Sequence, residues 1–379
     1  MTEPSFNSRY RCLDLWRGIA ALFVVIYHAG SYAAHRQTEL SFFELVSTKF
    51  IQHLDIGVLI FFVISGYCIS ASAESFRDID YKSTFRFFIL RFRRIYPPYW
   101  MALVFAMFVG FWGLYESAYV TDEFANPLTL SFSQWFGNIT LTETWLPRFT
   151  QSNSEVLLLK PSWSLCYEVQ FYLLMGLMLI FRVKLLYWTI LISVITLMTM
   201  FFPQIVGLQS VYRSFLDGQW LFFGIGILVF YALQFQKEKM WWWKLGLWSL
   251  ALGQFIIGFI YRSDIAIYYT FSTLFGLTLI IMYSDDQYIS SSAVAKPLMY
   301  CGKISYSLYL IHLPVCSFLA PKIYSWGLTS ITHTMTITIP VCIIISLILA
   351  MIFYRYCEKP FINNHLVAKK EPVFISSSV

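Results

Sequence analysis

The amino-acid sequence predicts an all-α, polytopic membrane protein with about ten transmembrane helices and both termini in the cytoplasm. The first observation behind this fold class is composition: of 379 residues, 58% are apolar and only 13% are charged, against about 25% charged in an ordinary soluble domain. The second is that apolar runs recur along the whole chain, each close to the roughly twenty residues with which a helix crosses about 30 Å of hydrocarbon. A soluble globular enzyme of average composition is therefore excluded.

Ten of these runs are predicted to span the membrane. They cover about residues 13–33, 56–73, 96–115, 163–181, 184–203, 214–234, 241–262, 265–284, 304–325 and 335–355. The first run follows Arg9 and Arg11, as the apolar part of a signal peptide would. Its length, and the presence of Arg17 and His28 within it, favour a retained first helix.

The distribution of basic residues between alternating loops predicts the topology. An even number of spans places both termini on one side, and the segments on that side carry 19 of the 27 Lys and Arg residues. The opposite loops carry 7, and Arg17 lies inside a span. Because cytoplasmic loops are enriched in Lys and Arg, both termini are predicted to be cytoplasmic. The net charge of +6 is then mainly topological and does not indicate nucleic-acid binding.

The chain is predicted to form one membrane domain. Residues 1–363 make up this domain, and residues 364–379 are expected to be a short, disordered cytoplasmic tail. The seven cysteines are scattered, odd in number and without a C-x-x-C pair. They indicate neither a disulfide framework nor a metal site.

One stretch before the third span has an amphipathic pattern. Between Tyr81 and Arg94, apolar side chains recur at Phe85, Phe88, Ile89 and Phe92, which is the spacing of a helical stripe. Basic residues flank the stripe, with Arg91 and Arg94 together on one side. The pattern predicts a helix that lies along the inner surface of the membrane.

Three ionisable residues inside the predicted spans are functional candidates, because a charged side chain at mid-membrane costs at least about 2.5 to 3.5 kcal/mol. They are Arg17, His28 and Glu168. Eleven helical residues separate Arg17 from His28, which places them on one face about 16 Å apart. Glu168 is expected at a depth similar to that of His28.

These residue types suggest a chemistry. A neutral imidazole beside a carboxylate has the composition of an oriented general base, and an arginine at the cytoplasmic end suits a phosphate or a developing oxyanion. Taken by themselves, Arg17 and His28 have an alternative interpretation: Arg17 extends to the interface, and His28 hydrogen-bonds a neighbouring helix.

Five segments, in order along the chain, resemble the integral-membrane acyltransferase-3 family. They are LDLWRGIAAL at residues 13–22 followed by Tyr27 and His28, FFVISGY at 61–67, RFRRIYP at 91–97, PSWSL at 161–165 leading to Glu168, and ISYSLYLIH at 304–312. In the first helix of this family, the signature is a basic residue that is followed, after ten residues, by a histidine. Arg17 and His28 have this spacing. Larger members of the family add a soluble esterase-like domain after the last helix. Only a short segment follows the last predicted span here, so a stand-alone transmembrane form is expected.

The resemblance implies transfer of an acyl group, commonly acetyl, from cytoplasmic acyl-CoA to a hydroxyl of a cell-surface polysaccharide or a lipid-linked glycan. By position, it implies that His28, Glu168 and Arg17 are catalytic and that Arg17, Arg91 and Arg94 bind the CoA co-substrate. The expected partners are therefore acyl-CoA, the glycan acceptor and membrane lipids, with no metal and no nucleic acid. The expected location is the bacterial inner (plasma) membrane.

Six further residues in these motifs are secondary candidates. They are Ser65, Tyr67, Trp163, Ser164, Tyr306 and His312. Pro314 follows His312, so a helix break stabilised by a histidine hydrogen bond is an alternative to a direct role. Gly66, between Ser65 and Tyr67, is expected to allow close helix packing rather than to contact substrate.

A different class of protein also fits the buried charges. In a proton-coupled transporter or exporter of a small molecule, His28 and Glu168 would form a proton relay.

For the acyltransferase, two routes of transfer are open. His28 can act as a general base in direct transfer, or it can carry the acyl group itself.

Overall fold

The computed structural model describes residues 10–36, 40–76, 81–115, 125–145, 155–202, 214–235, 240–261 and 264–362. These residues form helices and irregular connections and contain no strand, which confirms the all-α prediction. The predicted tail at 364–379 lies outside the described residues. The principal helices are α1 (Cys12–Ala34), α2 (Phe42–Gln52), α3 (Gly57–Glu74), α4 (Tyr81–Tyr115), α5 (Phe132–Thr140), α7 (Ser162–Phe181), α8 (Leu185–Phe201), α10 (Gln219–Phe235), α11 (Met240–Tyr261), α12 (Asp264–Met282), α13 (Asp286–Ser291), α14 (Ala295–Lys303), α15 (Ser305–Ser325), α16 (Ile331–His333), α17 (Ile339–Phe353) and α18 (Lys359–Ile362).

Every predicted span coincides with apolar helical structure. Among the described residues, seven helices or joined helices are long and apolar enough to cross a membrane, and the pair α14 and α15, bent by 79°, makes an eighth if it is counted as one span. The fifth and sixth predicted spans correspond to shorter apolar helices, Leu185–Met200 and Gln219–Gln234. The total of ten spans and the cytoplasmic position of the termini stay predictions.

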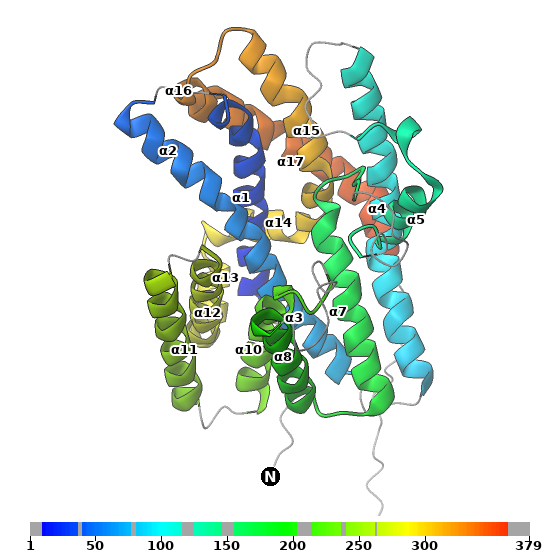
Figure 1. Ribbon diagram of the computed structural model, residues 1–379, viewed down its shortest axis with the longest axis vertical. Helices are drawn as coiled ribbons and strands as arrows, with labels where there is room; N and C mark the ends of the chain where they lie inside the picture. The colour runs from blue at the N-terminus through cyan, green and yellow to red at the C-terminus, as the bar shows by residue number, and fades with distance from the viewer. Residues whose placement is uncertain are drawn as a thin grey trace, which may run out of the picture.

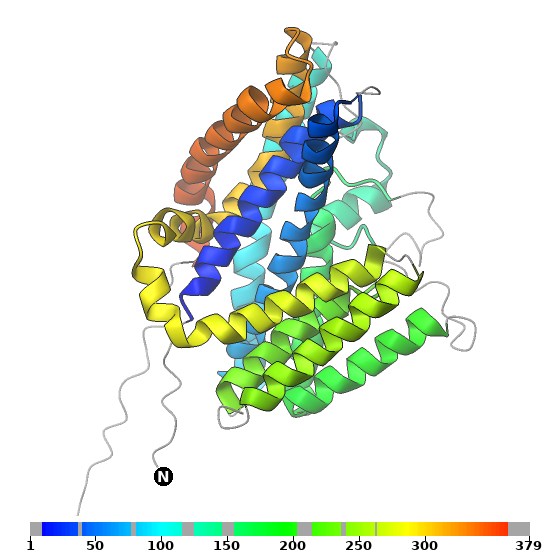
Figure 2. The same cartoon turned by 90° about the vertical axis from the view of Figure 1, so that its left-hand side faces the viewer.

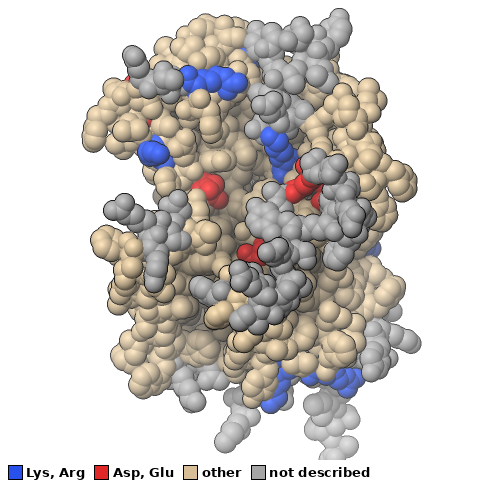
Figure 3. Space-filling view, in the orientation of Figure 1, with Lys and Arg blue, Asp and Glu red and all other residues tan. Residues whose placement is uncertain are grey.

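Helix α1 lies at the centre of the molecule, where it packs against α3, α14 and α15 (Figures 1 and 2). Helices α8, α10, α11 and α12 form a separate group in the lower half of Figure 1, which joins the centre through contacts of α10 with α3. Charged side chains are sparse on the face that Figure 3 shows, and most of its described surface is neither acidic nor basic. This surface suits contact with lipid.

Glycines set the closest helix crossings. A Cβ at Gly302 of α14 would lie 1.7 Å from the carbonyl oxygen of Asp14, and one at Gly18 of α1 would lie 2.0 Å from that of Leu298. In the same way a Cβ at Gly66 would lie 2.1 Å from the carbonyl oxygen of Phe223 in α10. Small residues at these crossings let the backbones touch. The packing role predicted for Gly66 is therefore confirmed.

The amphipathic stretch differs from the prediction of a separate surface helix. It is the first part of α4, which continues for 35 residues through Pro97 and Pro98. Phe85, Ile89 and Phe92 of the predicted apolar stripe are exposed and Phe88 is half-buried, whereas Arg91 and Arg94 line a cavity that opens outward. In a membrane the apolar face of a helix can turn to lipid and the basic face inward, so the pattern identifies the faces but not which of them is buried.

Helix α15 runs without a break past Pro314, so the structure does not show the helix break that was the alternative interpretation of His312. The sharp change of direction lies instead at Ile304, between α14 and α15. This bend brings the start of α15 toward the residues of α1, α3, α4 and α7 that line the cavity.

Candidate functional site

The site is a cavity between five helices, with about 800 Å³ of space between protein atoms, including the part that opens outward. Four ionisable side chains line it: Arg17 from α1, Arg91 and Arg94 from α4, and Glu168 from α7. The remaining lining residues are Val58, Phe61, Phe62, Ser65, Cys68, Ile69, Ile95, Ser164, Leu165, Tyr172, Ser305, Tyr306 and Tyr309. The residues predicted to hold CoA therefore lie together, although they come from different parts of the sequence.

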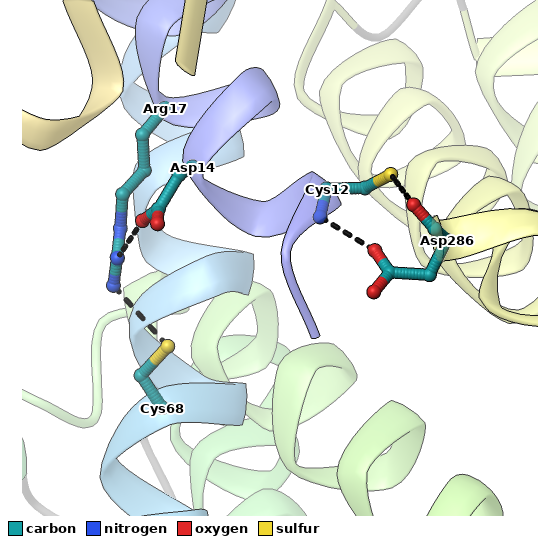
Figure 4. A network of polar contacts seen from close by, with 5 residues as sticks. All are labelled: Cys12, Asp14, Arg17, Cys68 and Asp286. Atoms are coloured by element: carbon teal, nitrogen blue, oxygen red, sulfur yellow. Dashed lines mark hydrogen bonds and ion pairs between the residues drawn. The ribbon is translucent and has the colours of Figure 1, made fainter. Parts of the chain in front are cut away.

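Arg17 is held by two neighbours (Figure 4). Its Nη1 donates to Oδ1 of Asp14 at 3.1 Å, one helical turn earlier, and its Nη2 donates to Sγ of Cys68 in α3 at 3.2 Å. The start of α1 is itself anchored, because the carboxylate of Asp286 accepts the backbone amide of Cys12 at 2.7 Å. Arg17 is thus a positioned guanidinium within the protein rather than one that extends to the interface.

Arg91 and Arg94 approach the cavity from the same face of α4. The guanidinium of Arg91 lies 5.4 Å from the ring centre of Tyr172, and its Nε is buried without a hydrogen-bond partner among the described residues. Arg94 lies within electrostatic range of Glu168 and Tyr172. A buried donor without a partner is costly, so this part of the cavity favours an anionic ligand.

Glu168 is bound into the same cavity by hydroxyl groups. Its Oε1 accepts the hydroxyl of Tyr172 at 2.6 Å and that of Ser65 at 3.3 Å. Arg17 is paired with Asp14, whereas Glu168 lines the cavity together with Arg91 and Arg94. Among the charged side chains that line the cavity, there are three arginines and one carboxylate.

Glu168 lines the same cavity as Arg17, whereas His28 is not among the residues that line it; the similar depth of Glu168 and His28 stays a prediction. The residues before α7 bear on that depth. Leu158, Leu159 and Ser162 are buried, so α7 begins inside the protein rather than at a membrane surface. Counting residues from the start of this helix therefore does not measure depth.

His28 has a different neighbour, His312 of α15. The centres of the two imidazole rings are 5.2 Å apart, with the ring planes inclined by 49°. His312 is fully buried, whereas His28 keeps part of its surface accessible. Tyr309 links this histidine pair to the cavity, because it lines the cavity and its ring centre lies 5.7 Å from that of His312.

The secondary candidates divide into two groups. Ser65, Ser164 and Tyr306 line the cavity. The hydroxyl of Tyr306 donates to the carbonyl of Ile95 at 2.9 Å, and the hydroxyls of Ser164 and Tyr309 are 2.6 Å apart. Tyr67 and Trp163 instead pack against aromatic rings, those of Phe230 and Phe62, and the structure does not bring them to the cavity lining.

Two residues of the site are absent from the sequence predictions. Tyr172 lies one helical turn after Glu168 and holds its carboxylate. Glu358, 4% exposed, accepts the backbone amide of Ser307 at 3.1 Å and also the Ser307 hydroxyl. It also lies within electrostatic range of Arg94. Glu358 follows the end of the last predicted span, where a charged residue is expected to face solvent. Only its burial in the structure identifies it as part of the site.

Comparison with known proteins identifies the family. The family model of acyltransferase-3, which describes an acyltransferase domain, matches residues 10–355. The chain therefore belongs to the acyltransferase-3 family. No curated protein and no solved structure matches it. Within the described residues no cluster of three or more His, Cys, Asp or Glu side chains could hold a metal ion.

Proposed function

We propose that this acyltransferase moves an acyl group, acetyl in the simplest case, from acyl-CoA to a hydroxyl group of a cell-surface polysaccharide or lipid-linked glycan. The observation that carries the proposal is the convergence of Arg17, Arg91 and Arg94 on one cavity. Acyl-CoA carries phosphate groups, and guanidinium groups bind phosphates through charge-assisted, often bidentate hydrogen bonds.

The donor would lie with its phosphates on the arginines and its thioester directed toward Tyr309. Arg91 has the greater capacity for a new anion, because Asp14 already pairs with Arg17, whereas the Nε of Arg91 is buried without a hydrogen-bond partner among the described residues. The predominantly basic side of the predicted topology supports entry of this co-substrate from the cytoplasm.

His28 would act as the general base. Its imidazole takes the proton of the acceptor hydroxyl, and the hydroxyl oxygen attacks the thioester carbonyl. The thiolate of CoA then leaves, and His28 returns the proton to it. Because His28 is partly accessible and linked to the cavity through His312 and Tyr309, an acceptor on its exposed side could meet the donor there. An acylated His28 intermediate uses the same residue.

The test is acyl transfer by the purified protein. With labelled acetyl-CoA, we expect release of free CoA that depends on the acceptor glycan, together with label in the glycan. A His28→Asn variant with undiminished glycan acylation would rule out both the base and the acyl-histidine routes. Transport of a substrate that emerges unaltered, without CoA release, would instead support the proton-coupled carrier. The proton relay would need His28 and Glu168 to lie together. Within the described residues Glu168 instead contacts Tyr172 and Ser65, and His28 lies beside His312.

A further inference from the structure

We infer that His312 is a positioning residue that orients the imidazole of His28. This inference rests on the proposed role of His28 as the base, and it assigns to a second histidine the orienting role that a carboxylate has in other catalytic bases. Glu168 is not available for that role, since its contacts are Tyr172 and Ser65 in the arginine cavity.

The hydrogen bonds of His312 define its tautomer. Its Nδ1 lies 2.7 Å from the carbonyl oxygen of Tyr309 and 3.2 Å from that of Leu308. Carbonyl oxygens only accept hydrogen bonds, so Nδ1 carries a proton. In the neutral ring Nε2 then carries a lone pair, and this atom is buried without a hydrogen-bond partner among the described residues.

The position of His28 supplies a partner for that lone pair. No hydrogen bond joins the two rings among the described residues, but with the ring centres 5.2 Å apart a rotation of the His28 ring would bring one of its nitrogens to the hydrogen-bond distance of about 3 Å. A His28 nitrogen that bears a proton would donate to Nε2 of His312. The other His28 nitrogen would then be free of a proton and able to accept one from the acceptor hydroxyl.

The difference in burial decides which histidine meets the substrate. His312 is fully buried, and His28 is the partly accessible member of the pair. When His28 takes up a proton during transfer, both of its nitrogens become donors. The lone pair of His312 then stabilises the imidazolium.

Two substitutions separate the functions of the two nitrogens. In His312→Asn the amide can still donate to the Tyr309 carbonyl, but it has no atom at the position of Nε2. In His312→Gln the longer side chain can place an oxygen acceptor there. His35→Asn is the matched control, because His35 makes the same kind of contact, 2.7 Å from Nδ1 to the carbonyl of Ser31, but is exposed.

The first measurement is the ¹⁵N NMR spectrum of the full-length protein with labelled histidines, in which the His28 signals are identified by their loss in His28→Asn. We expect one tautomer of His28 in the wild type and in His35→Asn, a mixture in His312→Asn, and a return toward one tautomer in His312→Gln. An unchanged His28 tautomer in His312→Asn, in protein that still elutes as a folded species, would overturn the inference.

The second measurement is kinetic. We expect kcat of His312→Asn to fall by between about 10-fold and 10⁴-fold, with KM for acetyl-CoA unchanged and with partial recovery in His312→Gln. A rise in KM without loss of kcat would contradict a positioning role. If the wild type transfers no acyl group but the NMR signals respond as expected, the proposed function fails and the orientation of His28 by His312 stands.

Discussion

The carboxylate of Glu358, from the last described turns of the chain, accepts the backbone amide of Ser307 in the first turn of α15 at 3.1 Å. A negative charge at this position satisfies a free amide of the helix and interacts favourably with the positive end of its dipole. The contact ties the end of the chain to the bend before α15, next to Ser305 and Tyr306 of the cavity.

We expect Glu358→Ala to destabilise the protein by about 1–3 kcal/mol, because it leaves the buried Ser307 amide and hydroxyl without their acceptor. Glu358→Gln keeps one acceptor oxygen and should lose less. Thermal unfolding of the purified variants in detergent measures the effect. An Ala variant as stable as the wild type would show that the contact does not support the fold.

Replacing Arg91 and Arg94 together by Ala should weaken acyl-CoA binding by about 100-fold or more, since each arginine contributes at least one charge-assisted hydrogen bond of roughly 1.5–3 kcal/mol and about 1.4 kcal/mol is tenfold. Titration of binding to a non-hydrolysable acyl-CoA analogue measures this change. Arg86→Ala is the control, because Arg86 belongs to the same helix but is not among the residues that line the cavity. Equal affinity in the double variant and the control would place the donor elsewhere.

A methyl group at Gly302 should separate α1 from α14, because the nearest atom, the carbonyl oxygen of Asp14, belongs to the backbone and cannot rotate away. We expect Gly302→Ala to cost about 1–3 kcal/mol of stability, as overpacking does, and to weaken donor binding through the displaced Asp14 and Arg17. Gly253→Ala adds a methyl group in α11, where nothing lies within 4 Å. That control should unfold at the wild-type temperature or above, and a similar loss in both variants would contradict the close-packing explanation.

Glu143 introduces a pH dependence of stability. Burial raises the pKa of its carboxyl from 4.5 to about 7, and the backbone amide of Val156, which donates to it, opposes this shift only in part. The folded state then binds more protons than the unfolded state between pH 4.5 and 7, so the free energy of unfolding falls as pH rises through that interval and stays level above it.

The measurement is the difference in unfolding temperature between wild type and Glu143→Gln at pH 5 and at pH 8. Because glutamine resembles the protonated carboxyl, the variant should gain stability relative to the wild type at pH 8. A difference that does not change between the two pH values would contradict the raised pKa.

Several properties of the candidate site could be predicted from local sequence. The resemblance to the acyltransferase-3 family implied that Arg17, Arg91 and Arg94 form one anion-binding group, and they do line one cavity. The stripe of Phe85, Phe88, Ile89 and Phe92 was identified as a helix face, and three of its four side chains are exposed. A periodicity gives the face of a helix, whereas the helices packed around it decide which face is covered.

The sequence by itself determined the membrane class, the all-helical structure and the identity of the rare ionisable residues, because these follow from apolar run length and from the cost of charge in hydrocarbon. Only the tertiary structure decided how those residues are paired. The α1–α14 crossing at Gly18 and Gly302, the buried start of α7 and the 79° bend before α15 place Glu168 with the arginines and His28 beside His312. Such pairings depend on the relative depth and rotation of packed helices, which no single segment encodes.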